Sequence, residues 1–95
     1  MLDLRPSCER CDRDLPPAST EAMICAFECT FCAPCVTDVL ENVCPNCGGG
    51  FSPRPIRPKD ALVKYPASTK RVVKPVNPRH ADLLARYRDL PPEQR

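Results

Sequence analysis

The chain has 95 residues and a formal net charge of +2, with eight cysteines, thirteen prolines and no tryptophan. Only 5% of it is aromatic, and a chain this short rarely folds on apolar burial alone, because ordering each residue costs about 1.5 kcal/mol of conformational entropy. Its longest apolar run, residues 22–27, is too short to span a membrane, and its first residues lack the basic and apolar regions of a secretory signal. We therefore expect a cytoplasmic protein, in which clustered cysteines bind metal more often than one another.

Charge and cysteine content divide the chain near residue 51. Residues 1–51 hold all eight cysteines and have three basic and eight acidic side chains, a net charge of −5. Residues 52–95 have eleven basic and four acidic side chains, a net charge of +7. We predict a cysteine-rich, two-zinc finger domain over 1–51 and a proline-rich basic tail over 52–95. The tail begins with closely spaced prolines, which favour an extended and semi-rigid chain.

In chain order, the finger domain is predicted to contain a strand and a short helix. Residues 23–27 favour the strand. The helix is predicted to begin at Pro34, because a proline at the first helical position loses no hydrogen bond there. Apolar residues then recur at helical spacing: Val36, Val39, Leu40 and Val43. Three of these four are valine, a poor helix former, so this helix should depend on its packing.

The tail contains two predicted helical segments. The first, about residues 60–65, ends at a proline. The second, about residues 78–90, follows Asn77 as a capping residue and ends before two prolines. Both need a surface to pack against, and we favour the acidic finger domain over a partner. His80, in the first turn of the second segment, is predicted to be a packed or surface histidine and not a ligand.

The cysteines are the strongest functional signal in the sequence, and they occur mostly in pairs. Their spacing is Cys8-x2-Cys11-x13-Cys25-x3-Cys29-x2-Cys32-x2-Cys35-x8-Cys44-x2-Cys47. A tetrahedral zinc site needs four ligands, about 2.3 Å from the metal when all are sulfur. Two cysteines separated by two residues can present both sulfurs to one ion. Eight thiols fill two such sites, so we predict two structural Zn²⁺ ions, with the cysteines grouped either in sequence or in interleaved pairs.

Other uses of the cysteines are less favoured. A disulfide framework is typical of secreted chains, and a thioredoxin-like dithiol needs a βαβ context for which this domain is too short. The cysteine runs typical of iron–sulfur clusters end differently. When all eight cysteines act as ligands, no open metal position remains, and the sequence offers no nucleophile–base set or carboxylate pair. We therefore predict no catalytic residues and no enzyme activity.

Three features resemble a RING-type zinc finger. They are the order of the cysteine pairs, the stretch Phe31-Cys32-Ala33-Pro34-Cys35 before a short helix, and the closing Cys44-Pro45-Asn46-Cys47. The resemblance implies a small metal-stabilised α+β fold, of the RING-like or treble-clef cross-brace type, with one short helix. In that arrangement, one zinc ion is bound by Cys8, Cys11, Cys32 and Cys35. The other is bound by Cys25, Cys29, Cys44 and Cys47.

A narrower resemblance covers most of residues 1–75. It rests on residues 1–17, on Cys25-Ala-Phe-Glu-Cys29-Thr-Phe-Cys32 and on Lys64-Tyr-Pro-Ala-Ser-Thr69. These stretches resemble a family of short bacterial proteins known as a domain of unknown function, family 1272, which implies no established activity.

A RING-type ubiquitin ligase is the least favoured functional alternative. Ligases of that type usually bind the conjugating enzyme through an apolar residue just after the first ligand cysteine, and many have an arginine just after the last. Glu9 and Gly48 stand at these positions, and a charge buried on docking is costly. The family resemblance also implies a bacterial chain, in which the ubiquitin cascade is normally absent.

We predict a non-catalytic zinc-binding interaction or adaptor module, with a protein partner and no membrane association, as a monomer or small homo-oligomer. The main alternative is nucleic-acid binding through the basic tail, which would be salt-sensitive and tolerant of sequence. The candidate cations are Arg54, Arg57, Lys59, Lys64, Lys70, Arg71, Lys74, Arg79, Arg86 and Arg88. Only Tyr65 and Tyr87 are available there to stack on bases, so base stacking would contribute little to such binding.

Overall fold

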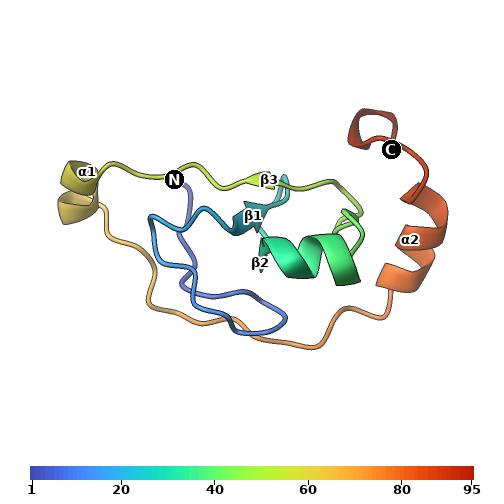
Figure 1. Cartoon of the computed structure of the whole chain (residues 1–95), viewed down its shortest axis with the longest axis horizontal. Helices are drawn as coiled ribbons and strands as arrows, with labels where there is room; N and C mark the ends of the chain where they lie inside the picture. The colour runs from blue at the N-terminus through green and yellow to red at the C-terminus, as the bar shows by residue number, and fades with distance from the viewer.

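A three-stranded antiparallel sheet forms the centre of the molecule in the computed structural model, which describes residues 1–95 (Figure 1). Its strands are β1 (Ala22–Ile24), β2 (Thr30–Cys32) and β3 (Ser52–Pro53), in the order β2-β1-β3. Met23, in the middle of β1, lies opposite Phe31 of β2. Together with short helices, the sheet makes the small α+β fold that the sequence predicts. Its third strand comes from the first residues of the tail.

The predicted strand over 23–27 is wrong in its second half, because β1 ends before Cys25. The chain turns there: the Glu28 N–H donates to the Cys25 carbonyl at 3.0 Å, and the Cys25 N–H donates to the Cys29 carbonyl at 3.2 Å. Glu28 has a left-handed φ of 65°. This turn brings Cys25 and Cys29 toward each other and leaves the Phe27 side chain 74% exposed.

The predicted helix after Pro34 is a short π-helical segment, η1 (Cys35–Val39). The Leu40 N–H donates to the Cys35 carbonyl, five residues back, at 2.9 Å, which is the spacing of a π-helix. Most of its predicted apolar face is buried in the core: Val36, Leu40 and Val43. Val39 packs partly against the same core. Burial of this face stabilises a segment that valine residues alone would not hold helical.

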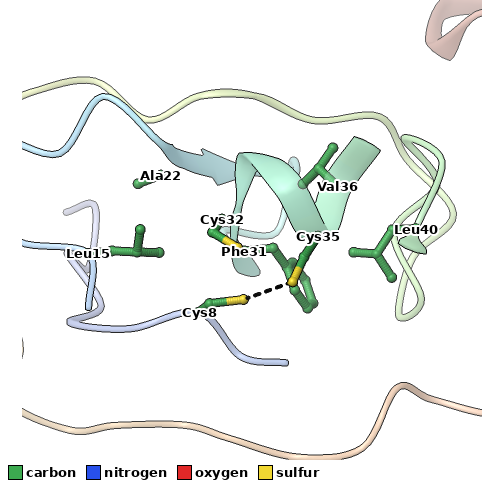
Figure 2. Close-up of a cluster of buried hydrophobic side chains, with 8 residues drawn as sticks. All are labelled: Cys8, Leu15, Ala22, Phe31, Cys32, Cys35, Val36 and Leu40. Atoms are coloured by element: carbon green, nitrogen blue, oxygen red, sulfur yellow. Dashed lines mark hydrogen bonds between the residues drawn. The ribbon is translucent and has the colours of Figure 1, made fainter. Parts of the chain in front are cut away.

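Sulfur makes up much of the small core (Figure 2). The main cluster consists of Cys8, Leu15, Ala22, Phe31, Cys32, Cys35, Val36 and Leu40. Phe31 packs edge-on against the partly buried Phe51, with ring centroids 5.6 Å apart. Only 20 of the 95 residues are buried, so the core contains few large apolar side chains.

The tail runs along the length of the molecule twice (Figure 1). From β3 it extends to α1 (Lys59–Lys64) at one end, and it returns along the finger domain to α2 (His80–Tyr87) and η2 (Pro92–Gln94) at the other end. Both α-helices overlap the segments predicted to be helical. No residue of α1 is buried, whereas α2 buries His80 and Leu83. None of the helices combines the length and the apolar character that crossing a membrane requires.

Polar contacts join the tail to the finger domain along most of this course. The joined residues are Arg54 with Leu15, Arg57 with Leu2, Ser68 with Leu4, Arg71 with Asp12 and Asp14, Lys74 with Glu9, His80 with Leu40, Arg88 with Glu41, and Arg95 with Asn42. The basic tail therefore lies against the acidic finger domain. We call residues 66–79, the return segment between α1 and α2, the strap.

Helix α2 packs closely on the backbone of Gly48. This glycine has a φ of 79°, and a Cβ atom there would lie 2.8 Å from Cε2 of Tyr87. The Cδ2 atom of Leu83, also in α2, would lie 3.3 Å from the same Cβ. A glycine at this position therefore supplies both the left-handed backbone and the space that α2 needs.

Candidate metal centres

The first candidate centre brings together Cys8, Cys11, Cys32 and Cys35, whose Sγ atoms all lie within 4.8 Å of one another. The Cys8 and Cys35 sulfurs are 3.8 Å apart, and the Cys11 and Cys32 sulfurs are 3.7 Å apart. Four sulfur atoms placed tetrahedrally about 2.3 Å from one zinc ion lie about 3.8 Å from one another. The spacing of this cluster therefore fits an all-sulfur tetrahedral site.

A tight turn after Cys8 and the junction between β2 and η1 build this centre. In the first, the Arg10 N–H donates to Cys8 Sγ at 3.4 Å, and the Asp12 N–H donates to the Cys8 carbonyl at 3.0 Å. The other two cysteines lie at the junction of two elements, since Cys32 ends β2 and Cys35 begins η1. Figure 2 shows Cys8 facing these two residues across the core. Backbone N–H groups directed at sulfur favour the thiolate form that a metal needs.

The second candidate centre brings together Cys25, Cys44 and Cys47, whose Sγ atoms also lie within 4.8 Å of one another. Backbone donors again point at sulfur, with the Phe27 N–H 3.3 Å from Cys25 Sγ and the Gly49 N–H 3.4 Å from Cys47 Sγ. These contacts repeat the turn geometry of the first centre. Both centres therefore contain cysteines in the turns that typically bind metal.

Cys29 lies beside the second centre, and its thiol contacts those of Cys44 and Cys25. The Asn46 amide donates to Cys29 Sγ at 3.4 Å. The four sulfurs of Cys25, Cys29, Cys44 and Cys47 are not all within 4.8 Å of one another, and the three without Cys29 form the compact group. Three residues separate Cys25 from Cys29, whereas two separate the other pairs, so the turn between these two is wider.

The thiols of Cys25, Cys35 and Cys44 carry protons at neutral pH, because their pKa values are raised. Burial raises the pKa of Cys25 to about 11 and the pKa of Cys35 to about 12. A hydrogen bond from Cys44 lowers the pKa of Cys29 to about 5, and the same contact raises the pKa of Cys44. A bound cation would displace these protons, because thiolates, not thiols, bind metal.

Two polar side chains contact the sulfurs without having been predicted to do so. Arg10 Nη1 lies 3.5 Å from Cys35 Sγ, and Asn46 contacts Cys29 as described. Each occupies a position between two closely spaced cysteines, which is the sequence signal that could have identified it. His80, by contrast, belongs to neither centre, because its Nε2 is 3.0 Å from the Leu40 carbonyl.

The comparisons with known proteins agree with the family resemblance. The family model described as "Protein of unknown function (DUF1272)" matches residues 1–57, which include all eight cysteines. The chain is also 65% identical over 75 residues to an uncharacterized protein of Rhizobium meliloti (strain 1021), an alignment that covers 79% of this chain and 89% of that protein. No solved structure matches the chain significantly.

Proposed function

The chain belongs to the DUF1272 family, and we propose that it is a non-catalytic zinc-binding interaction module. Two structural Zn²⁺ ions would take the place of the large apolar core that the chain lacks. The observation that carries this proposal is the cluster of Cys8, Cys11, Cys32 and Cys35, whose sulfurs have the separations of a tetrahedral all-sulfur site. Four thiolates favour zinc over hard cations such as Mg²⁺ and Ca²⁺.

The ligands would be arranged as a RING-like cross-brace. Cys8, Cys11, Cys32 and Cys35 would bind one ion, and Cys25, Cys29, Cys44 and Cys47 the other. The interleaved order of the two groups along the chain supports this arrangement, since Cys25 lies between the two halves of the first group. The contact of Cys29 with Cys44 supports its inclusion, because a change of side-chain torsion is enough to redirect a thiol.

The closed character of both sites supports a structural role. Four protein ligands leave no coordination position for water or substrate, whereas catalytic zinc sites keep one open. Five of the eight cysteines are buried, so ions bound by them would lie inside the fold. An ion in this position stabilises the folded chain directly, because the unfolded chain has no preformed site.

The surroundings of Glu9 argue against a RING-type ligase. Its side chain is only 2% exposed, and its carboxylate accepts hydrogen bonds from Arg5 and from the Thr30 N–H. The Lys74 N–H of the strap donates to the Glu9 carbonyl at 3.0 Å. The position that follows the first ligand cysteine is therefore occupied by contacts within this chain and is not free to bind a conjugating enzyme.

The contacts of the tail arginines argue against nucleic-acid binding as the main role. Five of these arginines bind carbonyl or carboxylate groups of the finger domain: Arg54, Arg57, Arg71, Arg88 and Arg95. A guanidinium that already has such partners must give them up before it can bind phosphate. Attachment of the tail to the finger domain thus accounts for much of the positive charge.

A partner would bind most readily at the α1 end of the molecule. Three apolar side chains are exposed there, with Val63 at 87%, Ile56 at 53% and Tyr65 at 40%. Arg57 holds this region together by donating to the Tyr65 carbonyl at 2.7 Å and to the Leu2 carbonyl at 2.8 Å. Exposed apolar groups on an ordered segment are typical of interaction surfaces.

Metal analysis of the purified, reduced protein tests the proposal. We expect two zinc ions per chain, and we expect a strong chelator to unfold the protein, as followed by circular dichroism. Restoring zinc should restore the fold. A protein that keeps its fold with no bound metal would contradict the proposed function.

A further inference from the structure

Cys11 differs from the other cysteines in its access to solvent. It is exposed, whereas five cysteines are buried and two are half-buried. An open hollow of about 680 Å³ lies beside it, lined by Arg10, Cys11, Val73, Lys74, Pro75 and Val76. A small molecule can therefore reach the first centre at Cys11, while the other three sulfurs of that centre are buried.

Two cations face the same hollow. Arg10 Nη1 lies 3.5 Å from Cys35 Sγ, and Lys74 lines the hollow beside it. Neither side chain forms an ion pair with a carboxylate. Positive groups near a thiolate stabilise it, and they also stabilise an oxyanion that leaves during attack by the sulfur.

A second thiol is placed to react with an oxidised Cys11. Cys32 Sγ lies 3.7 Å from Cys11 Sγ, and Cys32 is buried. Such a pair combines an accessible sulfur that meets the oxidant first with a protected sulfur that reacts afterwards.

We propose that Cys11 is a modification site for hydroperoxides, and that its oxidation to a disulfide with Cys32 releases the zinc ion of the first centre. The proposal rests on the proposed function, because zinc must occupy that centre. In the first step, the Cys11 thiolate attacks the peroxide, the O–O bond breaks, and one proton completes the leaving alcohol or water, which gives a sulfenic acid on Cys11. In the second step, the Cys32 thiolate attacks that sulfur, the S–S bond forms, and the hydroxyl group leaves with one proton as water. Two electrons pass from the two sulfurs to the peroxide, and zinc remains Zn²⁺.

The strap would respond to this change because it is anchored on the same turn. Arg71 binds the Asp12 and Asp14 carboxylates at 2.9 and 2.7 Å, and the Lys74 N–H donates to the Glu9 carbonyl at 3.0 Å. The acceptors of these three contacts, Glu9, Asp12 and Asp14, flank Cys11 in the sequence. Loss of the zinc ion would free the turn and with it the strap, so exchange of the Lys74 amide should become faster.

The test uses the full chain loaded with zinc, with hydrogen peroxide as the oxidant. Zinc content is measured first, and release is then followed with a metal-sensitive dye. We expect one equivalent to leave in a fast phase, with a Cys11–Cys32 disulfide in the peptide map and faster exchange of the Lys74 amide. Equal release of both ions, or a first disulfide within the second centre, would overturn the proposal. A starting content near zero would instead contradict the proposed function and this inference together.

Two variants separate the effect of Cys11 from general oxidation. Cys11→His removes the exposed thiol and offers imidazole, another zinc ligand, while Cys47→His makes the same change in the second centre. We expect Cys11→His to slow release of the first ion by about tenfold or more, and Cys47→His to leave the fast phase intact. A fast phase that persists in Cys11→His would overturn the proposal. If that variant binds only one zinc ion, the wild-type peptide map still decides the outcome.

Discussion

Sulfur atoms in this protein accept hydrogen bonds from donors that lie within the cysteine motifs or directly after them. Arg10 and Asn46 direct side-chain N–H groups at sulfur, and the backbone adds N–H groups from Phe27 and Gly49. Donors of this kind orient metal ligands and reduce the repulsion between neighbouring thiolates. At the residue scale, the sites are therefore prepared for negative charge before a cation binds.

Zinc affinity is expected to rise steeply with pH. The pKa values of Cys25 and Cys44 are raised, by burial and by the contact with Cys29 respectively, so both thiols are protonated at neutral pH. Each zinc ion bound in the second centre then displaces more than one proton, and the apparent affinity should increase by more than about tenfold per pH unit between about pH 6 and pH 8. Competition with a chelator of known pH dependence measures this slope. A slope of one proton or fewer would contradict the prediction.

Arg54 should be among the most important polar residues for stability. Its side chain is only 3% exposed, and it donates to the carbonyls of Arg5, Leu15 and Pro16 at 2.8 to 3.1 Å. Arg54→Leu leaves the Arg5 and Leu15 carbonyls without a partner, while the Pro16 carbonyl still accepts from the Ser19 N–H, and it should lower the free energy of unfolding by about 2–4 kcal/mol. Urea denaturation of the zinc-loaded protein measures it. Arg79→Leu, at an exposed arginine, is the control and should change stability by less than about 0.5 kcal/mol.

At the scale of elements, prolines decide where the sheet ends. β3 is an edge strand that ends at Pro53, and Pro55 and Pro58 follow it, so these three positions supply no backbone N–H groups. A strand with missing donors is a poor template for pairing with another chain. Pairing therefore stops at this edge of the sheet, and the tail leaves it in an extended conformation.

The contact between α2 and Gly48 predicts a difference between two neighbouring glycines. Gly48→Ala places a methyl group 2.8 Å from the Tyr87 ring at a φ of 79°, whereas a Cβ at Gly49 meets only Cys47 Sγ, at 3.4 Å. Gly48→Ala should therefore destabilise the protein by about 1–3 kcal/mol more than Gly49→Ala. Urea denaturation of both zinc-loaded variants is the measurement. Equal effects would show that α2 does not need this close approach.

Helix α1 should matter for binding and not for stability. It buries no side chain, so Val63→Glu should leave the zinc content and the free energy of unfolding unchanged. The same change places a charge in the proposed interaction surface and should abolish cross-linking to a cellular partner. Leu90→Glu, at an exposed position beyond α2 at the opposite end of the molecule, is the matched control. If Val63→Glu kept its cross-linking while Leu90→Glu lost it, the result would contradict the proposed surface.

At the scale of the whole molecule, opposite charges hold the two parts of the chain together. The tail has a net charge of +7 and the finger domain −5, and ion pairs between them occur at Arg71 and Arg88. All of these pairs are solvent-exposed and are therefore weakened by salt. The buried side chains of His80 and Leu83 add contacts that salt does not weaken in this way.

Removing Arg71 should loosen the strap and leave the metal centres intact. Arg71→Ala eliminates both ion pairs to Asp12 and Asp14, so exchange of the Lys74 amide should become several times faster while the metal content stays that of the wild-type protein. High salt should have a similar effect on the wild-type protein and little effect on the variant. Lys70→Ala, at an exposed neighbour in the strap, is the control. Unchanged exchange in Arg71→Ala would show that the ion pairs do not hold the strap.

Predictions from the sequence succeeded where one residue type recurs at a regular spacing. The spacing of the cysteines predicted clusters able to bind metal, and the apolar spacing after Pro34 predicted the helical segment that buries Val36 and Leu40. The prediction failed at Cys25, where a strand-like run of residues is interrupted by a turn. An apolar run favours a strand, but hydrogen bonds between Cys25 and Glu28 and between Cys25 and Cys29 bend the chain there.

By itself, the sequence determined the family of this chain, its small α+β class and the residues able to bind metal, because these depend on residue type and on short-range spacing. Only the tertiary structure decided that Cys25, Cys44 and Cys47 form a compact group with Cys29 beside it, and that Cys11 is the exposed sulfur. It also decided how the tail lies on the finger domain, through contacts such as that of Arg54 with Leu15. Contacts of this kind join residues far apart in the chain, and no local pattern specifies which distant groups will meet.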